Sequence, residues 1–227
     1  MGGNHEDYKY LRNCVERAGG NGVPLVPVET SGRIMWLPPG HVYEPNGIRI
    51  TGISGIDAAN CGRNPENYDS AAVINENDIL DWTLEIWKSC AESDIDILLT
   101  HDGLPNAAKP GKGTFTLLNP IDALNPRYHF FGHYHTIVDP ISYADWLTNL
   151  AQGNPQVKER CSEPGRVRTT GVHINKLAFA RNDDRLRQHV MGLLEVDDAN
   201  DYRFEFVEDA WLSGIDRQTM WHVRGRH

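Results

Sequence analysis

The chain has 227 residues and a formal net charge of −9, with 40% hydrophobic and 23% charged residues. This is the composition of an ordinary globular protein, and it excludes a collagenous, disordered or membrane-spanning chain. The acidic balance argues against non-specific nucleic-acid binding through a basic surface. The four cysteines lie far apart and the first residues match no signal peptide, so we expect reduced thiols in a cytoplasmic protein without a membrane partner.

The N-terminal part alternates helical and extended patterns. Residues 7–18 carry apolar side chains at helical spacing and are followed by two glycines, which predicts a helix with a defined end. Short apolar runs at 23–28, 34–37 and 48–53 are separated by Gly, Pro and Asn, which is typical of strands and turns. The strongest helical pattern covers 76–90.

The following elements place polar residues at strand ends. An apolar strand is predicted at 95–100 and ends at His101; a loop follows at 106–114. A second strand is predicted at 128–131 and a short helix at 145–151. Late strands are predicted at 170–180, 189–196 and 202–207. This succession, without a linker or repeat, predicts one layered domain of α/β (α+β) type.

The charge is uneven along the chain. Residues 158–187 carry a local excess of +4, whereas 195–216 hold eight acids and one basic residue. A basic patch beside a phosphate substrate and a simple solvated surface both fit the first stretch, and the solvated surface is favoured. Lys109 and Lys112 could likewise reach a substrate phosphate from the 106–114 loop, although solvation alone accounts for them.

Three segments carry side chains suited to metal binding at element boundaries: 3–6 (Gly-Asn-His-Glu), 100–103 (Thr-His-Asp-Gly) and 132–135 (Gly-His-Tyr-His). Loops at the carboxyl ends of strands gather into sites. An amide oxygen with several imidazoles is a mixed N/O set that suits Mn²⁺, Fe, Zn²⁺ or Ni²⁺ better than Ca²⁺ or Mg²⁺. In the tight loop that Gly132 permits, His133 and His135 can diverge towards two ions.

The order and wording of these segments resemble the three C-terminal motifs of the calcineurin-like metallophosphoesterase family, which are G-N-H-[ED], a lone His after an apolar strand, and G-H-x-H. The resemblance covers about residues 2–140, and a strand-rich tail follows at 165–210. The wording at 2–6 and 52–56 is also similar to that of RNA lariat-debranching enzymes. The resemblance implies a metallophosphoesterase-like β-sheet sandwich flanked by helices.

The resemblance also implies a binuclear centre of two divalent ions, with Mn²⁺ the foremost candidate. Asn4, His101 and His133 correspond to ligands of one ion, and His135 to a ligand of the other. His5 corresponds to the histidine that contacts the phosphate and protonates the leaving oxygen.

Two acidic residues are further candidates for the site, whereas six other histidines are not. Glu6 and Asp102 are plausible partners that orient neighbouring imidazoles, although a helix-start acid is nearly as good an interpretation of Glu6. The remaining histidines are expected to be core or surface residues: His41, His129, His173, His189, His222 and His227.

The family's first two motifs, D-x-H and G-D-x-x-D, precede G-N-H-[ED], but here only Met1 and Gly2 do. Those motifs would supply most ligands of the first ion and the bridging carboxylate. We therefore expect residues 1–227 to be a single, N-terminally truncated domain of an enzyme that hydrolyses a phosphomonoester or phosphodiester, weakly active alone. A split enzyme completed by a partner chain, a non-catalytic scaffold and an unrelated single-ion histidine site are the alternatives. Nucleic acid remains among the open substrates.

Overall fold

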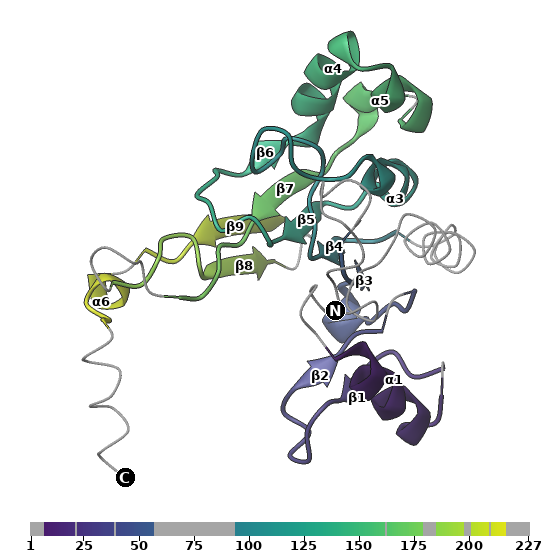
Figure 1. Cartoon of the computed structure of the whole chain (residues 1–227), viewed down its shortest axis with the longest axis vertical. Coiled ribbons are helices and arrows are strands. Elements are labelled where there is room, and N and C mark those ends of the chain that lie inside the picture. The colour runs from purple at the N-terminus through teal and green to yellow at the C-terminus, as the bar shows by residue number, and fades with distance from the viewer. Residues whose placement is uncertain are drawn as a thin grey trace, which may run out of the picture.

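A five-stranded mixed sheet forms the centre of the computed structural model (Figure 1). The model describes residues 7–56, 94–178, 185–197 and 201–216, except 21, 39, 162 and 209. The strands, in sheet order, are β3 (Ile50–Ile53), β4 (Ile97–Thr100), β5 (Tyr128–Phe131), β7 (Thr170–His173) and β6 (Ile141–Ser142). The first four run parallel and β6 runs antiparallel to β7. The carboxyl ends of four strands therefore meet at one edge, and the predicted α/β class is confirmed.

Alternation along β5 divides the sheet into two faces. His129 and Phe131 are buried, whereas Tyr128 and Phe130 are partly exposed. Because successive side chains of a strand point to opposite faces, each pair belongs to a different layer.

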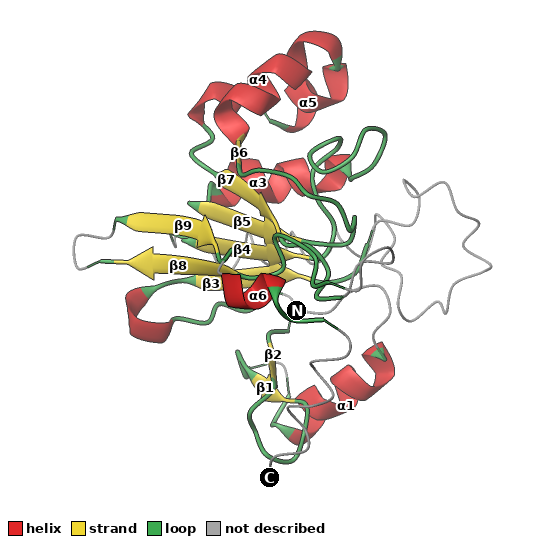
Figure 2. Cartoon of the chain, turned by 90° about the vertical axis from the view of Figure 1, so that its left-hand side faces the viewer, coloured by secondary structure: helices red, strands yellow, loops and turns green. Residues whose placement is uncertain are grey.

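The His129 face packs against the main helices of the chain. Their elements are η4 (Phe115–Leu117), α3 (Leu118–Leu124), α4 (Tyr143–Gly153), α5 (Pro155–Arg160) and η5 (Pro164–Arg166). Fully buried Leu118, Tyr143 and Leu147 join the strand residues Leu98 and Phe131 in one apolar core. In both views α4 and α5 lie together beyond the β6–β7 edge (Figures 1 and 2).

The Tyr128 face is covered by a hairpin of β8 (Gly192–Val196) and β9 (Tyr202–Phe206). The ring of Phe204 lies 5.3 Å from that of Phe130 and 6.4 Å from that of Tyr128. The layered arrangement expected from the sequence is thus present between the hairpin and the main sheet. A short helix, α6 (Ala210–Ser213), follows the hairpin.

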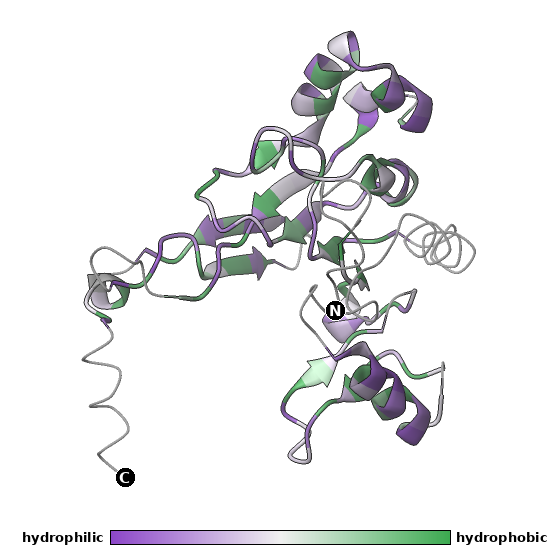
Figure 3. Cartoon of the chain, viewed as in Figure 1, coloured by the Kyte–Doolittle hydropathy of each residue, from purple (hydrophilic) through white to green (hydrophobic). Residues whose placement is uncertain are grey.

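A small N-terminal unit lies beyond the β3 edge (Figure 1). It consists of α1 (Tyr8–Arg17), β1 (Val26–Pro27), β2 (Met35–Trp36) and η1 (Pro45–Gly47). The Asp7 carboxylate caps α1 by accepting from the Tyr10 N–H at 2.9 Å, and Gly19 follows the helix with φ 110°. The predicted 7–18 helix is confirmed, and most of its ribbon has the colour of hydrophilic residues (Figure 3).

The late part of the chain departs from the predicted pattern. The strand predicted over 170–180 ends at His173, because Asn175 turns the chain: its side chain accepts from the Lys176 N–H at 2.8 Å and donates to the Gln188 carbonyl at 3.0 Å. Elements α3, α5, α6 and β6 were not predicted. The helix predicted at 76–90 lies outside the described residues. Within the described ranges, no helix is long and apolar enough to cross a membrane.

Candidate metal centre

Three histidines lie at the carboxyl edge of the parallel strands. His101 directly follows β4, His133 follows β5 after Gly132, and His173 is the last residue of β7. Phe131 and His173 are paired across β5 and β7, so the two loops begin at the same level. The sheet topology thus gathers side chains that are up to about seventy residues apart in sequence at the edge where α/β proteins place their sites.

His101 and His133 are in direct contact. The Nδ1 atom of His133 lies 3.2 Å from Nε2 of His101, and the rings meet edge to face with centroids 5.0 Å apart. The Gly132 N–H also donates to the His101 carbonyl at 3.2 Å, which ties the two loops together. Metal–nitrogen bonds of about 2.1 Å, at tetrahedral or octahedral angles, place two ligand nitrogens about 3.0–3.4 Å apart. The two ring nitrogens are at hydrogen-bonding distance, and their separation also lies within this range.

The loop that carries His133 and His135 is strained. His133 has φ 71° and is the central residue of a γ-turn, in which the Tyr134 N–H donates to the Gly132 carbonyl at 2.9 Å. His135 also has a positive φ, 51°. Left-handed backbone at a non-glycine residue is uncommon and costs of order 1–3 kcal/mol, and such strain clusters at functional sites.

Asp102 connects the loop after β4 with the loop after β5. It is only 4% exposed, and its carboxylate accepts from the Gly103 N–H at 2.8 Å and from the hydroxyl of Tyr134. Tyr134 lies between His133 and His135, so this contact holds the second loop against the first. The imidazole-orienting role expected for Asp102 stays a prediction.

His135 is exposed. Its main-chain oxygen accepts from Arg187 Nη1 at 3.4 Å. Burial of part of the ring lowers the pKa of His135, and the cations Lys176 and Arg187 lower it further. The ring is therefore biased towards the neutral form that binds metals.

His173 is a core residue, as expected, and it lies next to the strained loop. It is 1% exposed, and neither ring nitrogen has a hydrogen-bond partner among the described residues. Burial lowers its pKa to about 4. The main chains of Gly132 and Thr136 raise the pKa, but by less than burial lowers it. The ring centroid of His173 lies 5.4 Å from that of Phe131. Its position at the end of an apolar strand could have drawn attention to His173. The strand predicted over 170–180 did not end there, so this position was not recognised.

His129 is a core residue, as expected. It is fully buried, with Nε2 2.7 Å from the Thr100 hydroxyl and Nδ1 2.7 Å from that of Tyr143. Burial lowers its pKa to about 3, so the ring is neutral. Its two nitrogens are engaged within the core, and it takes no part in the edge site.

The remaining candidates are distributed as follows. Asn4, His5 and Glu6 lie outside the described residues. Lys109 and Lys112 are exposed in a turn closed by a hydrogen bond from the Asn106 N–H to the Lys112 carbonyl, so their reach to a substrate stays a prediction. In the part of the chain that the structure describes, no three His, Cys, Asp or Glu side chains converge as a metal site.

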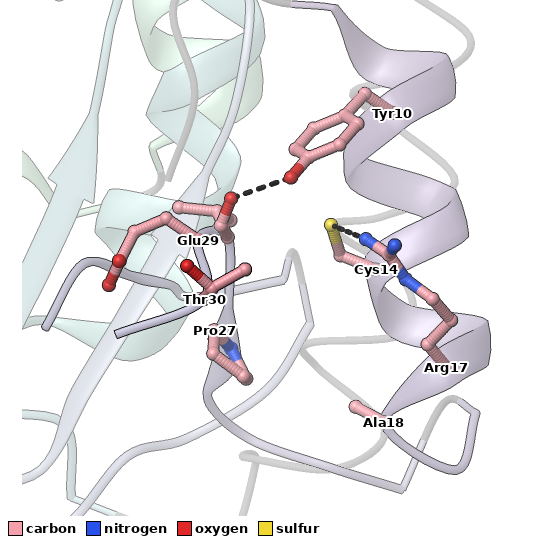
Figure 4. A pocket seen from close by; sticks show the side chains of 8 residues that line it. Tyr10, Cys14, Arg17, Ala18, Pro27, Glu29 and Thr30 are labelled. Atoms are coloured by element: carbon pink, nitrogen blue, oxygen red, sulfur yellow. Dashed lines mark hydrogen bonds between the residues drawn. The ribbon is translucent and has the colours of Figure 1, made fainter. Parts of the chain in front are cut away.

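A separate pocket of about 250 Å³ lies between α1 and the segment after β1 (Figure 4). Its lining includes Cys14, whose sulfur accepts from Arg17 Nη2 at 3.0 Å, and Tyr10, whose hydroxyl donates to the Val28 carbonyl at 2.8 Å. Cys14 and Cys161 are free and buried, and Cys61 and Cys90 lie outside the described residues. The pocket lies in the N-terminal unit, apart from the histidine edge.

Comparison with known proteins identifies no relative: no family model matches the chain, and no curated protein matches it.

Proposed function

We propose that this chain is a metal-dependent phosphoesterase, which hydrolyses a phosphomonoester or phosphodiester through a binuclear metal centre. The observation that supports the proposal best is the 3.2 Å separation of the His101 and His133 nitrogens at the carboxyl ends of adjacent parallel strands. The three motif segments, in the order seen in calcineurin-like metallophosphoesterases, give this pair its functional interpretation.

In this proposal each residue has a separate task. His101 and His133, with Asn4, would hold one ion, and His135 would hold the other. Such ions, when bound, would lower the pKa of a water molecule and stabilise the charge that develops on the phosphoryl oxygens. His5 contacts the phosphate and gives a proton to the leaving oxygen. The strain at His133 fixes the imidazole direction before any ion binds, which reduces the cost of assembling the centre.

A titration of the purified chain with Mn²⁺, followed by the electron paramagnetic resonance signal of the free ion, tests the centre. We expect His133→Ala and His101→Ala each to weaken binding about tenfold or more, because each removes a ligand. His41→Ala, in the N-terminal unit, serves as the control and should bind as the wild type does. Equal Mn²⁺ binding by all four proteins would remove the proposed centre.

Hydrolysis of an activated phosphodiester in the presence of Mn²⁺ separates the enzyme from its main alternative. A non-catalytic scaffold would bind the ion without turnover. The enzyme is supported if the chain turns over the substrate and if His5→Ala abolishes this turnover while the metal content stays unchanged. Metal binding without turnover, even when a completing partner chain is present, favours the scaffold.

A further inference from the structure

Two cations from the basic 158–187 stretch lie beside the candidate centre. Lys176 belongs to the turn after β7, and Arg187 to the segment before β8. Hydrogen bonds join these segments: Asn175 donates its N–H to the His189 carbonyl at 2.7 Å and its side-chain amide to the Gln188 carbonyl at 3.0 Å. The two cations are therefore held near each other by the fold rather than by chance proximity.

Arg187 also contacts the metal-binding loop itself. Its Nη1 donates to the His135 main-chain oxygen at 3.4 Å, and both Arg187 and Lys176 act electrostatically on the His135 ring. The buried Nε of Arg187 has no hydrogen-bond partner among the described residues. Of the five donors of the guanidinium, the described residues therefore engage only some.

The positive charge at this position is not neutralised within the described ranges. Neither Lys176 nor Arg187 forms an ion pair there, and a nearby acid, Glu208, lies 3.2 Å from His189 Nε2 instead. In a chain of net charge −9, two cations that form no ion pair with a described residue, beside the candidate centre, are a local departure from the overall charge.

We propose that Lys176 and Arg187 bind a second phosphate of the substrate, adjacent to the phosphate that is hydrolysed at the histidine centre. The proposal rests on the proposed function. It makes the two cations specificity-determining residues: a substrate with a neighbouring phosphate is bound more tightly than an isolated phosphoester.

The surroundings favour an oligonucleotide as the source of that second phosphate. His135 and Lys176 are both exposed, so the cations border an open surface rather than the enclosed cavity in which small ligands are bound. An open cationic surface suits an extended chain of regularly spaced phosphates. A nucleoside diphosphate offers the same chemistry in a smaller molecule, and the experiment distinguishes the two.

Fluorescence anisotropy of a labelled single-stranded pentanucleotide tests the subsite. The titration is done in EDTA, so that no metal contributes to binding. We expect the double variant Lys176→Gln/Arg187→Gln to bind about tenfold or more weakly at low salt. The slope of log affinity against log salt should decrease in magnitude by about 0.7, because the contact to one phosphate is lost. Lys158→Gln, an exposed cation of α5 from the same basic stretch, should bind as the wild type does.

Each outcome bears on one part of the inference. Equal binding by the double variant and Lys158→Gln would overturn the subsite. Competition by a nucleoside diphosphate as strong as that of the unlabelled pentanucleotide would overturn the choice of an oligonucleotide while supporting the phosphate subsite. Binding that depends on Lys176 and Arg187 but occurs without any metal binding or hydrolysis would remove the proposed function and retain the subsite. Circular dichroism spectra confirm that each variant is folded.

Discussion

His133 and His101 are 32 residues apart in the sequence, yet their Nδ1 and Nε2 atoms lie 3.2 Å from each other. The parallel register of β4 and β5, in which Leu99 pairs with Phe130, accounts for this contact, because it brings the two strand ends to one level. The γ-turn at His133 then directs its ring towards His101. Two backbone features, a register and a turn, therefore build the pair.

The strain at His133 predicts that glycine is more stable than alanine at this position. Because glycine adopts a positive φ without steric cost, we expect His133→Gly to be more stable than His133→Ala by about 1 kcal/mol, although both lose the imidazole. Urea unfolding measures the difference, and the Mn²⁺ titration should show weak binding by both variants.

The matched control is the same pair of substitutions at His101, which does not have a positive φ. There His101→Gly should be less stable than His101→Ala, since glycine gains more conformational freedom on unfolding. If His133→Gly were also less stable than His133→Ala, the strained turn would not exist in solution.

Burial of His129 predicts a loss of stability in acid. Its pKa is about 3 in the fold, below the ordinary value of 6.5, so the unfolded chain binds the proton more readily. The contribution of His129 is therefore fully present above about pH 6.5 and is lost as the pH falls towards 3, at up to about 1.4 kcal/mol per pH unit. Urea unfolding across this range should show a shallower pH dependence for His129→Gln than for the wild type.

Tyr143→Phe provides a comparison that disturbs the same buried contact but keeps the titrating ring. It should lower stability at all pH values while its pH dependence stays close to that of the wild type. A pH dependence for His129→Gln identical to that of the wild type would show that other groups cause the acid sensitivity.

The contact between Tyr134 and Asp102 should stabilise the two loops as a unit. Tyr134→Phe removes the hydroxyl donor and leaves a buried carboxylate with one partner fewer, so we expect the free energy of unfolding to fall by about 1–3 kcal/mol. Asp102→Asn and the double variant complete a mutant cycle, with an expected coupling of about 1 kcal/mol. Strictly additive effects would mean that the contact contributes nothing.

The sequence predicts the edge site in part, for a clear reason. His101 and His133 each follow a short apolar strand whose end was located correctly, and parallel strands bring such ends together. The positions of Lys176 and Arg187 could not be predicted, because they depend on hydrogen bonds between Asn175 and a segment more than ten residues later. No local pattern contains that pairing.

Some helices also escaped prediction for physical reasons. Helix α3 contains Pro120 at its third position, where a proline is tolerated because the first turn needs no N–H donor. Its apolar residues are too few for a clear helical period. Helix α5 is six residues long and begins at Pro155, with the Asn154 side chain accepting from the Gln156 N–H at 3.0 Å. This Asn-Pro sequence is typical of a helix start and could have predicted α5.

The buried contact from Tyr143 through His129 to Thr100 also guards the alignment of the two central strands. If β4 slid along β5 by one residue, Thr100 would leave His129, and polar atoms in an apolar core would lose their partners. The same displacement would draw His101 away from His133. A shift in strand register that separates the two histidines would thus also break hydrogen bonds in the core. The same buried contacts that stabilise the sheet therefore disfavour folds in which the candidate site is misassembled.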